Sequence, residues 1–216
     1  MLPQQELVRS AQYRDSFKGV TLYGVAGTNG SGKDSLMNLL AEHGFLLFNT
    51  GDALREISQA VFNSVDRGGG ESPVGRLGNA FRTAYPSGMT ELGLLKWWAR
   101  VAVLPVEMWP KGLAIGSLRG TGEVRRLKEL GGKLIVVDAD PRVRYDRLTK
   151  RGRGDDNITF EQFLDKEAQE MAVGQTDPAK FGMAAVIDEA DIRIENNGND
   201  IEAFKRQAAA ALVLST

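Results

Sequence analysis

The stretch 24–35 reads GVAGTNGSGKDS, and within it Gly27, Gly32 and Lys33 follow the spacing Gly-x-x-x-x-Gly-Lys. Glycines at this spacing let the backbone curl so that successive N–H groups point at one bound anion. A helix that begins near Lys33 would add its positive N-terminal end, and the lysine would reach the terminal phosphates of a polyphosphate. The pattern is therefore typical of a phosphate-binding P-loop.

The residues on either side of this loop supply the context that the motif requires. Val20–Val25 has the composition of a buried strand, and Leu36–Glu42 has the pattern of a helix. Strand, glycine-rich loop and helix in this order favour a P-loop over the alternative, an ordinary glycine-rich turn. We therefore expect the helix to begin at about Lys33 and to stop before Gly44.

The loop departs from its commonest form at Asp34. A serine or threonine usually follows the lysine and ligates magnesium, whereas this chain has Asp34 there and Ser35 one position later. An acidic side chain beside phosphates would repel them unless it faces a metal, the metal's water shell or a basic residue. We therefore expect Asp34 near hydrated Mg²⁺ or in an ion pair.

The composition of the whole chain excludes several classes of protein. Its 216 residues fit one domain, and its formal net charge of −1 provides no overall positive field to attract nucleic acid. The absence of cysteine excludes disulfides and thiolate chemistry and suits a reducing cytoplasm. No apolar run approaches the roughly 20 residues that span a bilayer, and the N-terminal residues lack the apolar core of a secretory signal. We therefore expect a cytoplasmic protein without a membrane or nucleic-acid partner.

Further apolar runs alternate with helical patterns along the rest of the chain, which predicts a parallel sheet covered by helices. After the first strand these runs lie at 45–48, at 113–119 where the strand runs into a loop, at 133–139 and, with edge-like alternation, at 190–197. The expected fold class is α/β, a three-layer P-loop NTPase fold with a five-stranded parallel sheet, helices on both faces and a helical insertion at 57–112. Residues 1–18 are expected to form an N-terminal arm, and residues 19–216 the domain.

Polar residues follow the second predicted strand, where residues 49–55 read NTGDALR. Ligands of open α/β sheets bind at the carboxyl ends of the strands, which places Asp52 and Arg55 on the same side as the P-loop. Thr50 or Asp52 can also cap the helix that begins here, with Arg55 as a solvated side chain.

This segment and the P-loop together resemble the adenylate kinases. Thr-Gly-Asp-x-Leu-Arg at 50–55 is similar to the segment after the second strand of that family, and the Lys-x-Ser order at 33–35 is similar to its Gly-Lys-Gly-Thr loop. The resemblance implies that Thr50 lies near the base of an acceptor nucleotide and that Arg55 binds its phosphate. It also implies that the insertion at 57–112 covers the acceptor, with Arg76 and Arg82 as candidate contacts.

Residues 113–119, LAIGSLR, are similar to the adenylate kinase run that ends in Asp-Gly-Phe-Pro-Arg. The resemblance pairs Gly116 with the glycine, and Arg119 with the arginine that binds the acceptor phosphate. Ile115 then stands where that family has its Walker B aspartate, so that Asp52 or Asp34 would have to supply this carboxylate. Glu123, which follows in the first turn of a helix, either interacts with the helix dipole or contacts the acceptor.

Six basic residues lie within residues 142–153, and one explanation is a solvated basic helix or a nucleic-acid patch. Another is suggested by DRLTKR at 146–151 and RGDD at 153–156, which resemble the runs that enter and close the lid of adenylate kinases. This resemblance implies that Arg147, Arg151 and Arg153 stabilise the transferring phosphoryl group and that the lid is a short loop at 151–157.

Near the C-terminus, Ala-Asp-x-x-Ile-x-Asn at 190–196 precedes Asn197 and Gly198. This pattern is similar to the end of dephospho-CoA kinases and of archaeal kinase-like P-loop proteins. The resemblance implies that the loop at Asn197 touches the adenine of ATP.

Together these features predict transfer of the γ-phosphoryl group of ATP, with Mg²⁺, to a nucleoside monophosphate or a similar small nucleotide. Two alternatives stay open: a dephospho-CoA kinase, with Asp52 as the base for a hydroxyl acceptor, and a regulatory or RNA-associated module that hydrolyses ATP slowly. The candidate residues are, for catalysis, Lys33, Asp52, Arg119, Arg147, Arg151 and Arg153; for ATP, Gly27, Asn29, Gly30, Ser31, Gly32, Lys33, Asp34, Ser35, Arg147 and Asn197; for the acceptor, Thr50, Asp52, Arg55, Arg82 and Arg119; and for Mg²⁺, Asp34, Ser35 and Asp52.

Overall fold

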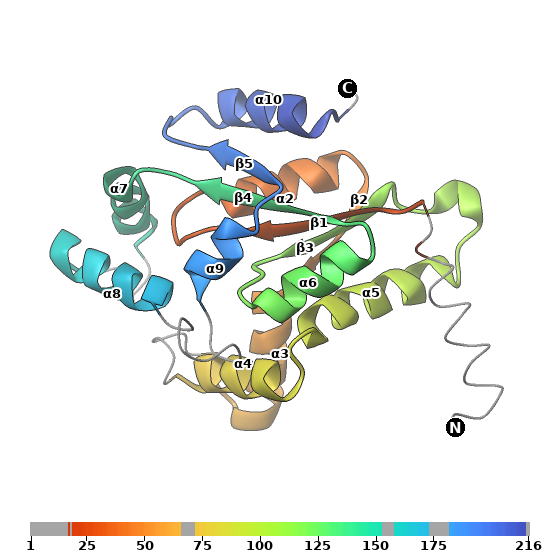
Figure 1. The fold of residues 1–216 in the computed structure, drawn as a ribbon, viewed down its shortest axis with the longest axis horizontal. Helices are drawn as coiled ribbons and strands as arrows, with labels where there is room; N and C mark the ends of the chain where they lie inside the picture. The colour runs from red at the N-terminus through yellow and green to blue at the C-terminus, as the bar shows by residue number, and fades with distance from the viewer. Residues whose placement is uncertain (1–16, 18, 66–71, 153–157, 173–181, 215–216) are drawn as a thin grey trace.

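The computed structural model describes residues 17, 19–65, 72–152, 158–172 and 182–214 (Figure 1). At its centre lies a sheet of five parallel strands in the order β2-β3-β1-β4-β5. The predicted strands are confirmed, with β5 at an edge, and the strand that leads into the P-loop is the central one. The strands are β1 (Thr21–Ala26), β2 (Phe45–Asn49), β3 (Gly112–Gly116), β4 (Lys133–Asp138) and β5 (Ile192–Glu195).

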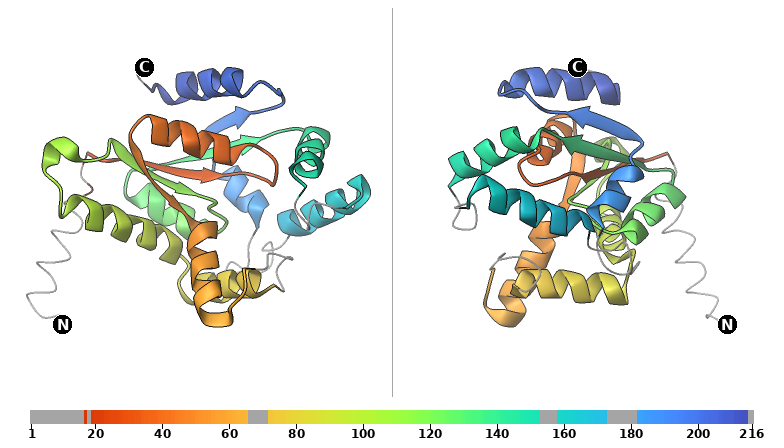
Figure 2. Two further views of the ribbon diagram at one scale, coloured as in Figure 1. Left: turned by 180° about the vertical axis from the view of Figure 1, so that it is seen from behind. Right: turned by 60° about the vertical axis from the view of Figure 1, so that its left-hand side comes forward.

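Helices cover both faces of the sheet and give the three layers expected from the alternation of strands and helices (Figures 1 and 2). One face is covered by α2 (Lys33–Glu42) and α10 (Ile201–Leu212), and the other by α5 (Gly88–Val101), α6 (Thr121–Glu129) and α9 (Met183–Asp188). The other helical segments are α3 (Thr50–Phe62), α4 (Pro73–Ala84), the short turn η1 (Val106–Met108), α7 (Pro141–Arg151) and α8 (Phe160–Ala172).

The alternation of side chains along the interior strands explains why these strands are apolar on both faces. Leu134 and Val136 of β4 belong to the apolar cluster on the α5, α6 and α9 face, whereas Ile135 and Val137 belong to the cluster under α2 and α10. A parallel strand buried on both sides therefore has no polar position in its centre. Trp97 of α5 is buried in the first cluster.

The start of α3 differs from the sequence prediction. Neither Thr50 nor Asp52 caps the helix, because the side chain of Asn49 accepts a hydrogen bond from the Gly51 N–H group at 2.9 Å. Asn49 is the last residue of β2, so the strand turns into the helix without a loop. The hydroxyl of Thr50 instead donates to the carbonyl oxygen of Ser117 at 2.8 Å, which ties the ends of β2 and β3 together.

The helices α4 and α5 form the predicted helical insertion between β2 and β3. Phe17 of the predicted N-terminal arm is buried in the core, and residues 1–16 and 18 lie outside the described residues. Residues 153–157 of the predicted lid also lie outside them.

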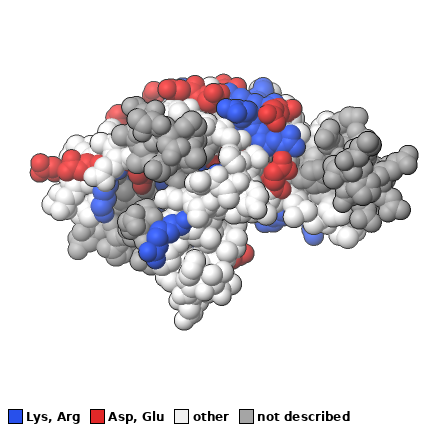
Figure 3. Space-filling model, turned by 60° about the horizontal axis from the view of Figure 1, so that its bottom comes forward, with Lys and Arg blue, Asp and Glu red and all other residues white. Residues whose placement is uncertain are grey.

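The surface of the described residues mixes charges of both signs on the face drawn in Figure 3, where Lys and Arg lie among Asp and Glu. None of the described helices has both the length and the apolar composition needed to cross a bilayer.

Candidate functional site

The glycine-rich loop after β1 is held against two other connections of the sheet. Gly30 and Gly32 have φ angles of +80° and +100°, in the left-handed region that favours glycine. A Cβ atom on Gly30 would lie 2.7 Å from the carbonyl oxygen of Arg144 in α7, and one on Gly32 would lie 2.2 Å from Nδ2 of Asn196 after β5. Glycine is therefore required here for close approach of the backbone as well as for its conformation.

The loop retains groups that can bind an anion. The first N–H groups of α2 include those of Lys33 and Asp34, and a helix supplies no acceptor for its own first turn. Ser31 Oγ is buried without a hydrogen-bond partner among the described residues, so it can donate to a phosphate oxygen. These features fit the phosphates of ATP.

Lys33 begins α2, and its ammonium donates to the Thr28 carbonyl oxygen at 3.3 Å. Burial lowers the pKa of Lys33, and the charges that act on it are those of Asp34, Arg119, Glu170 and Arg151. Two of the predicted catalytic arginines, Arg119 after β3 and Arg151 at the end of α7, therefore act electrostatically on the P-loop lysine. The predicted contacts of both arginines with the acceptor and the transferring phosphoryl group stay predictions, and Glu170 of α8, which also acts on Lys33, was not predicted from the sequence.

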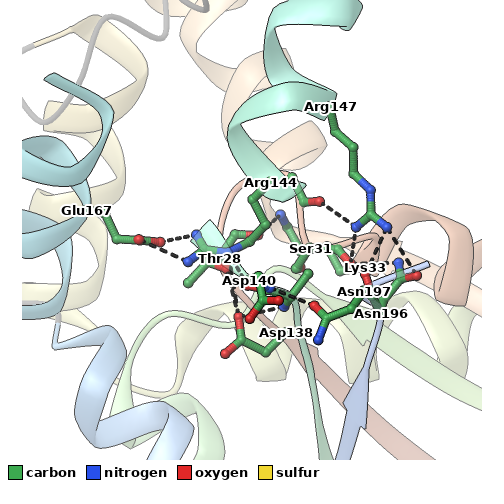
Figure 4. A network of polar contacts seen from close by, with 12 residues as sticks. Thr28, Ser31, Lys33, Asp138, Asp140, Arg144, Arg147, Glu167, Asn196 and Asn197 are labelled. Atoms are coloured by element: carbon green, nitrogen blue, oxygen red, sulfur yellow. Dashed lines mark hydrogen bonds and ion pairs between the residues drawn. The ribbon is translucent and has the colours of Figure 1, made fainter. Parts of the chain in front are cut away.

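Arg147 of α7 lies beside the same loop and is held by carbonyl groups (Figure 4). Its guanidinium donates to the carbonyl oxygens of Gly30 at 3.2 Å, of Asn196 at 2.8 Å and of Gly198. Burial lowers the pKa of Arg147. Arg147 thus joins the P-loop to the β5–α10 connection, and its predicted contact with the transferring phosphoryl group stays a prediction.

A second arginine of α7, which sequence reasoning did not single out, fixes the end of β4 and the position of α8. Arg144 donates through Nε to the Ala139 carbonyl oxygen at 2.6 Å and through both terminal nitrogens to Glu167 of α8 (Figure 4). Asp138, at the end of β4, accepts a hydrogen bond from the Thr28 hydroxyl at 3.3 Å. The P-loop, β4, α7 and α8 therefore form one connected network. Its members lie far apart in the sequence, so no local pattern could have predicted their partners.

The residues predicted to bind an acceptor lie around the ends of β2 and β3. Asp52 and Arg55, three apart in α3, form an ion pair with each other. Thr50 is buried under the Ser117 carbonyl group. Arg76 is exposed on α4. Contacts of these residues with an acceptor stay predictions.

Arg82 has a different environment from the open one expected for an acceptor contact. It is buried and paired with the buried Glu123 of α6, with Nε 2.6 Å from Oε1. The other carboxylate oxygen of Glu123 accepts hydrogen bonds from the N–H groups of Arg119 and Gly120 at 2.8 and 3.0 Å. Glu123 therefore links Arg82 of the insertion to the loop that carries Arg119. Its role goes beyond the predicted interaction with the helix dipole.

The end of β3 corrects the expected position of a Walker B carboxylate. Ile115 is fully buried on the α5 side, with its Cδ1 atom 3.0 Å from where a Cβ of Gly93 would lie. A Cβ on Gly116 would point to α2, 2.9 Å from Cε of Met37. The side chain that would face the P-loop helix is therefore that of residue 116, not of Ile115, and Met37 fills this space.

The remaining predicted residues have simpler environments. Asn29 and Asp34 are exposed, and Ser35 is partly buried in the first turn of α2. Asn197 accepts a hydrogen bond from the Asp140 N–H group at 2.7 Å. Within the described ranges no group of three His, Cys, Asp or Glu side chains could hold a metal ion, and Arg153 lies outside those ranges.

Comparison with solved structures establishes the fold. A shikimate kinase of Acinetobacter baumannii, solved in complex with shikimate, has a TM-score of 0.55 at 15% identity, over 93% of this chain and 97% of that one. A tunicamycin resistance protein of Deinococcus radiodurans has a TM-score of 0.50 at 18% identity, over 91% and 97%. The chain thus has the fold of the P-loop kinases.

Sequence comparison identifies the relatives. No family model matches the chain. A UPF0200 protein of Pyrobaculum aerophilum is 30% identical over 196 residues, which cover 90% of this chain and 98% of the relative. A UPF0200 protein of Sulfurisphaera tokodaii is 29% identical over 196 residues, 89% and 96% of the two chains. Because the Pyrobaculum protein is this similar over nearly its whole length, the chain belongs to the UPF0200 family.

Proposed function

We propose that this protein transfers the γ-phosphoryl group of ATP to a nucleoside monophosphate or a similar small nucleotide. The observation that carries the proposal is that Arg119, in the loop after β3, and Arg151, the last residue of α7, both lie near enough to Lys33 to lower its pKa. Cations around the terminal phosphate stabilise the charge of a transferring phosphoryl group, so they favour phosphoryl transfer over nucleotide binding alone. The fold, which a solved shikimate kinase shares, is compatible with this chemistry.

In this proposal the donor side consists of the loop and the start of α2. Lys33 and the N–H groups of residues 30–35 bind the terminal phosphates, and Ser31 donates its buried hydroxyl. When bound, Mg²⁺ would neutralise charge on the phosphates, and Ser35 and Asp34 are the residues of this turn that would hold it or its waters. Arg147 would keep the loop in its binding shape through its bonds to the loop carbonyls.

The acceptor side consists of the connections after β2 and β3. Arg119 and Arg55 would hold the acceptor phosphate, and Arg151, with Arg153, would stabilise the equatorial oxygens of the transferring group. A phosphate acceptor is already ionised at neutral pH and needs no strong base. If the acceptor were a hydroxyl group, as in a dephospho-CoA kinase, Asp52 would serve as the base.

One observation favours a second function, a nucleotide-binding module that hydrolyses ATP slowly. Met37 fills the space toward which a carboxylate at position 116 would point. The P-loop helix therefore receives no carboxylate from the end of β3 to organise the metal's waters.

Incubation of the protein with γ-labelled ATP, Mg²⁺ and a panel of acceptors separates these functions. We expect label in one or more nucleoside monophosphates, and loss of this transfer in the Lys33→Ala variant. Label in dephospho-CoA alone would support the hydroxyl acceptor. Slow release of phosphate, with no labelled acceptor in the panel, would contradict the proposal and favour the module.

A further inference from the structure

Three side chains lie on the same face of α8 and turn this face toward the P-loop. Phe163, Glu167 and Glu170 stand at positions i, i+4 and i+7, which share one face of a helix. Phe163 is buried, and the Arg144 guanidinium lies 5.5 Å from the centre of its ring. The rotation of α8 about its axis is therefore fixed by packing.

Glu167 supplies the second anchor of this face. Its carboxylate forms a two-pronged ion pair with Arg144, whose side chain is 5% exposed and also donates to the end of β4. Such a bidentate, largely buried pair defines geometry closely. Because Glu170 follows Glu167 by three residues, the anchor also fixes the direction in which Glu170 leaves the helix.

Glu170 lies opposite Arg119, with its Oε2 atom 3.9 Å from Nη1 of the arginine. The two side chains are 40% and 37% exposed. The backbone N–H group of Arg119 donates to the buried Glu123 carboxylate, which fixes the position of the Arg119 Cα atom. The backbone of Arg119 is thus held in place, whereas its guanidinium is only loosely paired. A guanidinium in this arrangement can exchange one anionic partner for another.

We propose that Glu170 is a specificity-determining residue that holds the place of the acceptor phosphate at Arg119. The inference rests on the proposed function and narrows its acceptor to a molecule that presents a dianionic phosphate. An exposed ion pair at this distance contributes little to stability and is easily exchanged. A dianion attracts Arg119 more strongly than one carboxylate does, so it displaces Glu170.

Molecules without this charge gain nothing from the exchange. Water and a neutral hydroxyl group carry no negative charge that could replace the Glu170 carboxylate beside Arg119. Arg119 therefore stays paired with Glu170 when only ATP is bound. Glu170 therefore favours phosphate-bearing acceptors and limits transfer to water. A structural surface pair would have no such effect on ligands.

The test measures the affinity for inorganic phosphate by calorimetry in protein whose P-loop is saturated with a non-hydrolysable ATP analogue, for the wild type and the Glu170→Gln variant. This substitution keeps the size of the side chain and removes its charge, and we expect phosphate to bind about fivefold more tightly, the effect of one charge at about 4 Å in water. The control is Glu161→Gln, which removes an exposed carboxylate in the first turn of the same helix, about 13 Å away along the axis. We expect this variant to bind phosphate as the wild type does.

A double-variant cycle with Arg119→Gln shows whether the effect runs through the arginine. We expect most of the gain from Glu170→Gln to vanish in the Arg119→Gln background. Equal phosphate affinity in the Glu170→Gln and Glu161→Gln variants, or a gain that persists undiminished without Arg119, would overturn the inference.

The acceptor panel described above, run on the same variants, keeps the two proposals apart. Transfer to a nucleoside monophosphate with unchanged phosphate affinity in Glu170→Gln would leave the function and remove the role of Glu170. Tighter phosphate binding by Glu170→Gln, without transfer to any acceptor, would support the role of Glu170 and contradict the proposed function.

Discussion

At the scale of single residues, the proposed binding of phosphate depends most on Lys33. Burial favours the neutral amine of Lys33 and so lowers its pKa. At alkaline pH below the ordinary lysine pKa, Lys33 therefore binds fewer protons in the folded protein than in the unfolded chain. The charged form is the one that attracts phosphate. The free protein therefore loses its P-loop charge at a lower pH than an exposed lysine would.

We expect the affinity for ATP to fall as the pH rises through this interval. The Lys33→Arg variant, whose guanidinium stays charged, should keep a constant affinity to higher pH even if its affinity at neutral pH is lower. Fluorescence titration with a labelled ATP analogue from about pH 7 to about pH 10, the range below the ordinary lysine pKa, measures both. Parallel pH profiles for the two proteins would show that Lys33 does not carry this dependence.

At the scale of elements, one buried glutamate joins the helical insertion to α6. Arg82 of α4 and Glu123 of α6 are both buried, 41 residues apart in the sequence, and Thr90 of α5 donates its hydroxyl to the Glu123 carbonyl oxygen at 2.9 Å. Three helices therefore meet at one glutamate. Removal of one partner from such a buried pair leaves an uncompensated charge.

We expect the Arg82→Met variant to lose about 3 kcal/mol of unfolding free energy, because Glu123 stays buried without its cation. The control is Arg100→Met, which changes an exposed arginine of α5 in the same way and should cost much less. Urea unfolding followed by circular dichroism measures both. Equal stability of the two variants would show that the Arg82–Glu123 pair does not stabilise this joint.

The elements also show what the sequence can and cannot predict. The helix Ile201–Leu212 and the strand from Lys133 were predictable because a capping Asp200 and a glycine pair mark their starts. The buried partner of Arg82 could not be predicted from the sequence. An arginine in a helix is expected to be exposed unless the element that packs against it is known. The sequence also did not show which face of the sheet Ile115 occupies, because a shift of one residue in a strand exchanges its faces.

At the scale of the whole molecule, the strand order separates the two sides of the site. The P-loop follows the central β1, Arg119 follows the neighbouring β3, and the Asn196 connection follows β5 at the opposite edge. This order was predictable only in part, since alternation predicts a parallel sheet but not which strands are neighbours. In the proposed function, the donor would lie toward β5 and the acceptor toward β2, with Lys33 between them.

The most direct test of this arrangement is the affinity for a single molecule that carries both anions, an adenosine joined by five phosphates to the nucleoside whose monophosphate accepts the label in the acceptor panel. If donor and acceptor sites face each other across Lys33, this compound should bind about 100-fold more tightly than ATP, because the second contact is made within one complex. Calorimetry with each compound measures the ratio. Binding no tighter than that of ATP would contradict the account and leave a protein with one nucleotide site.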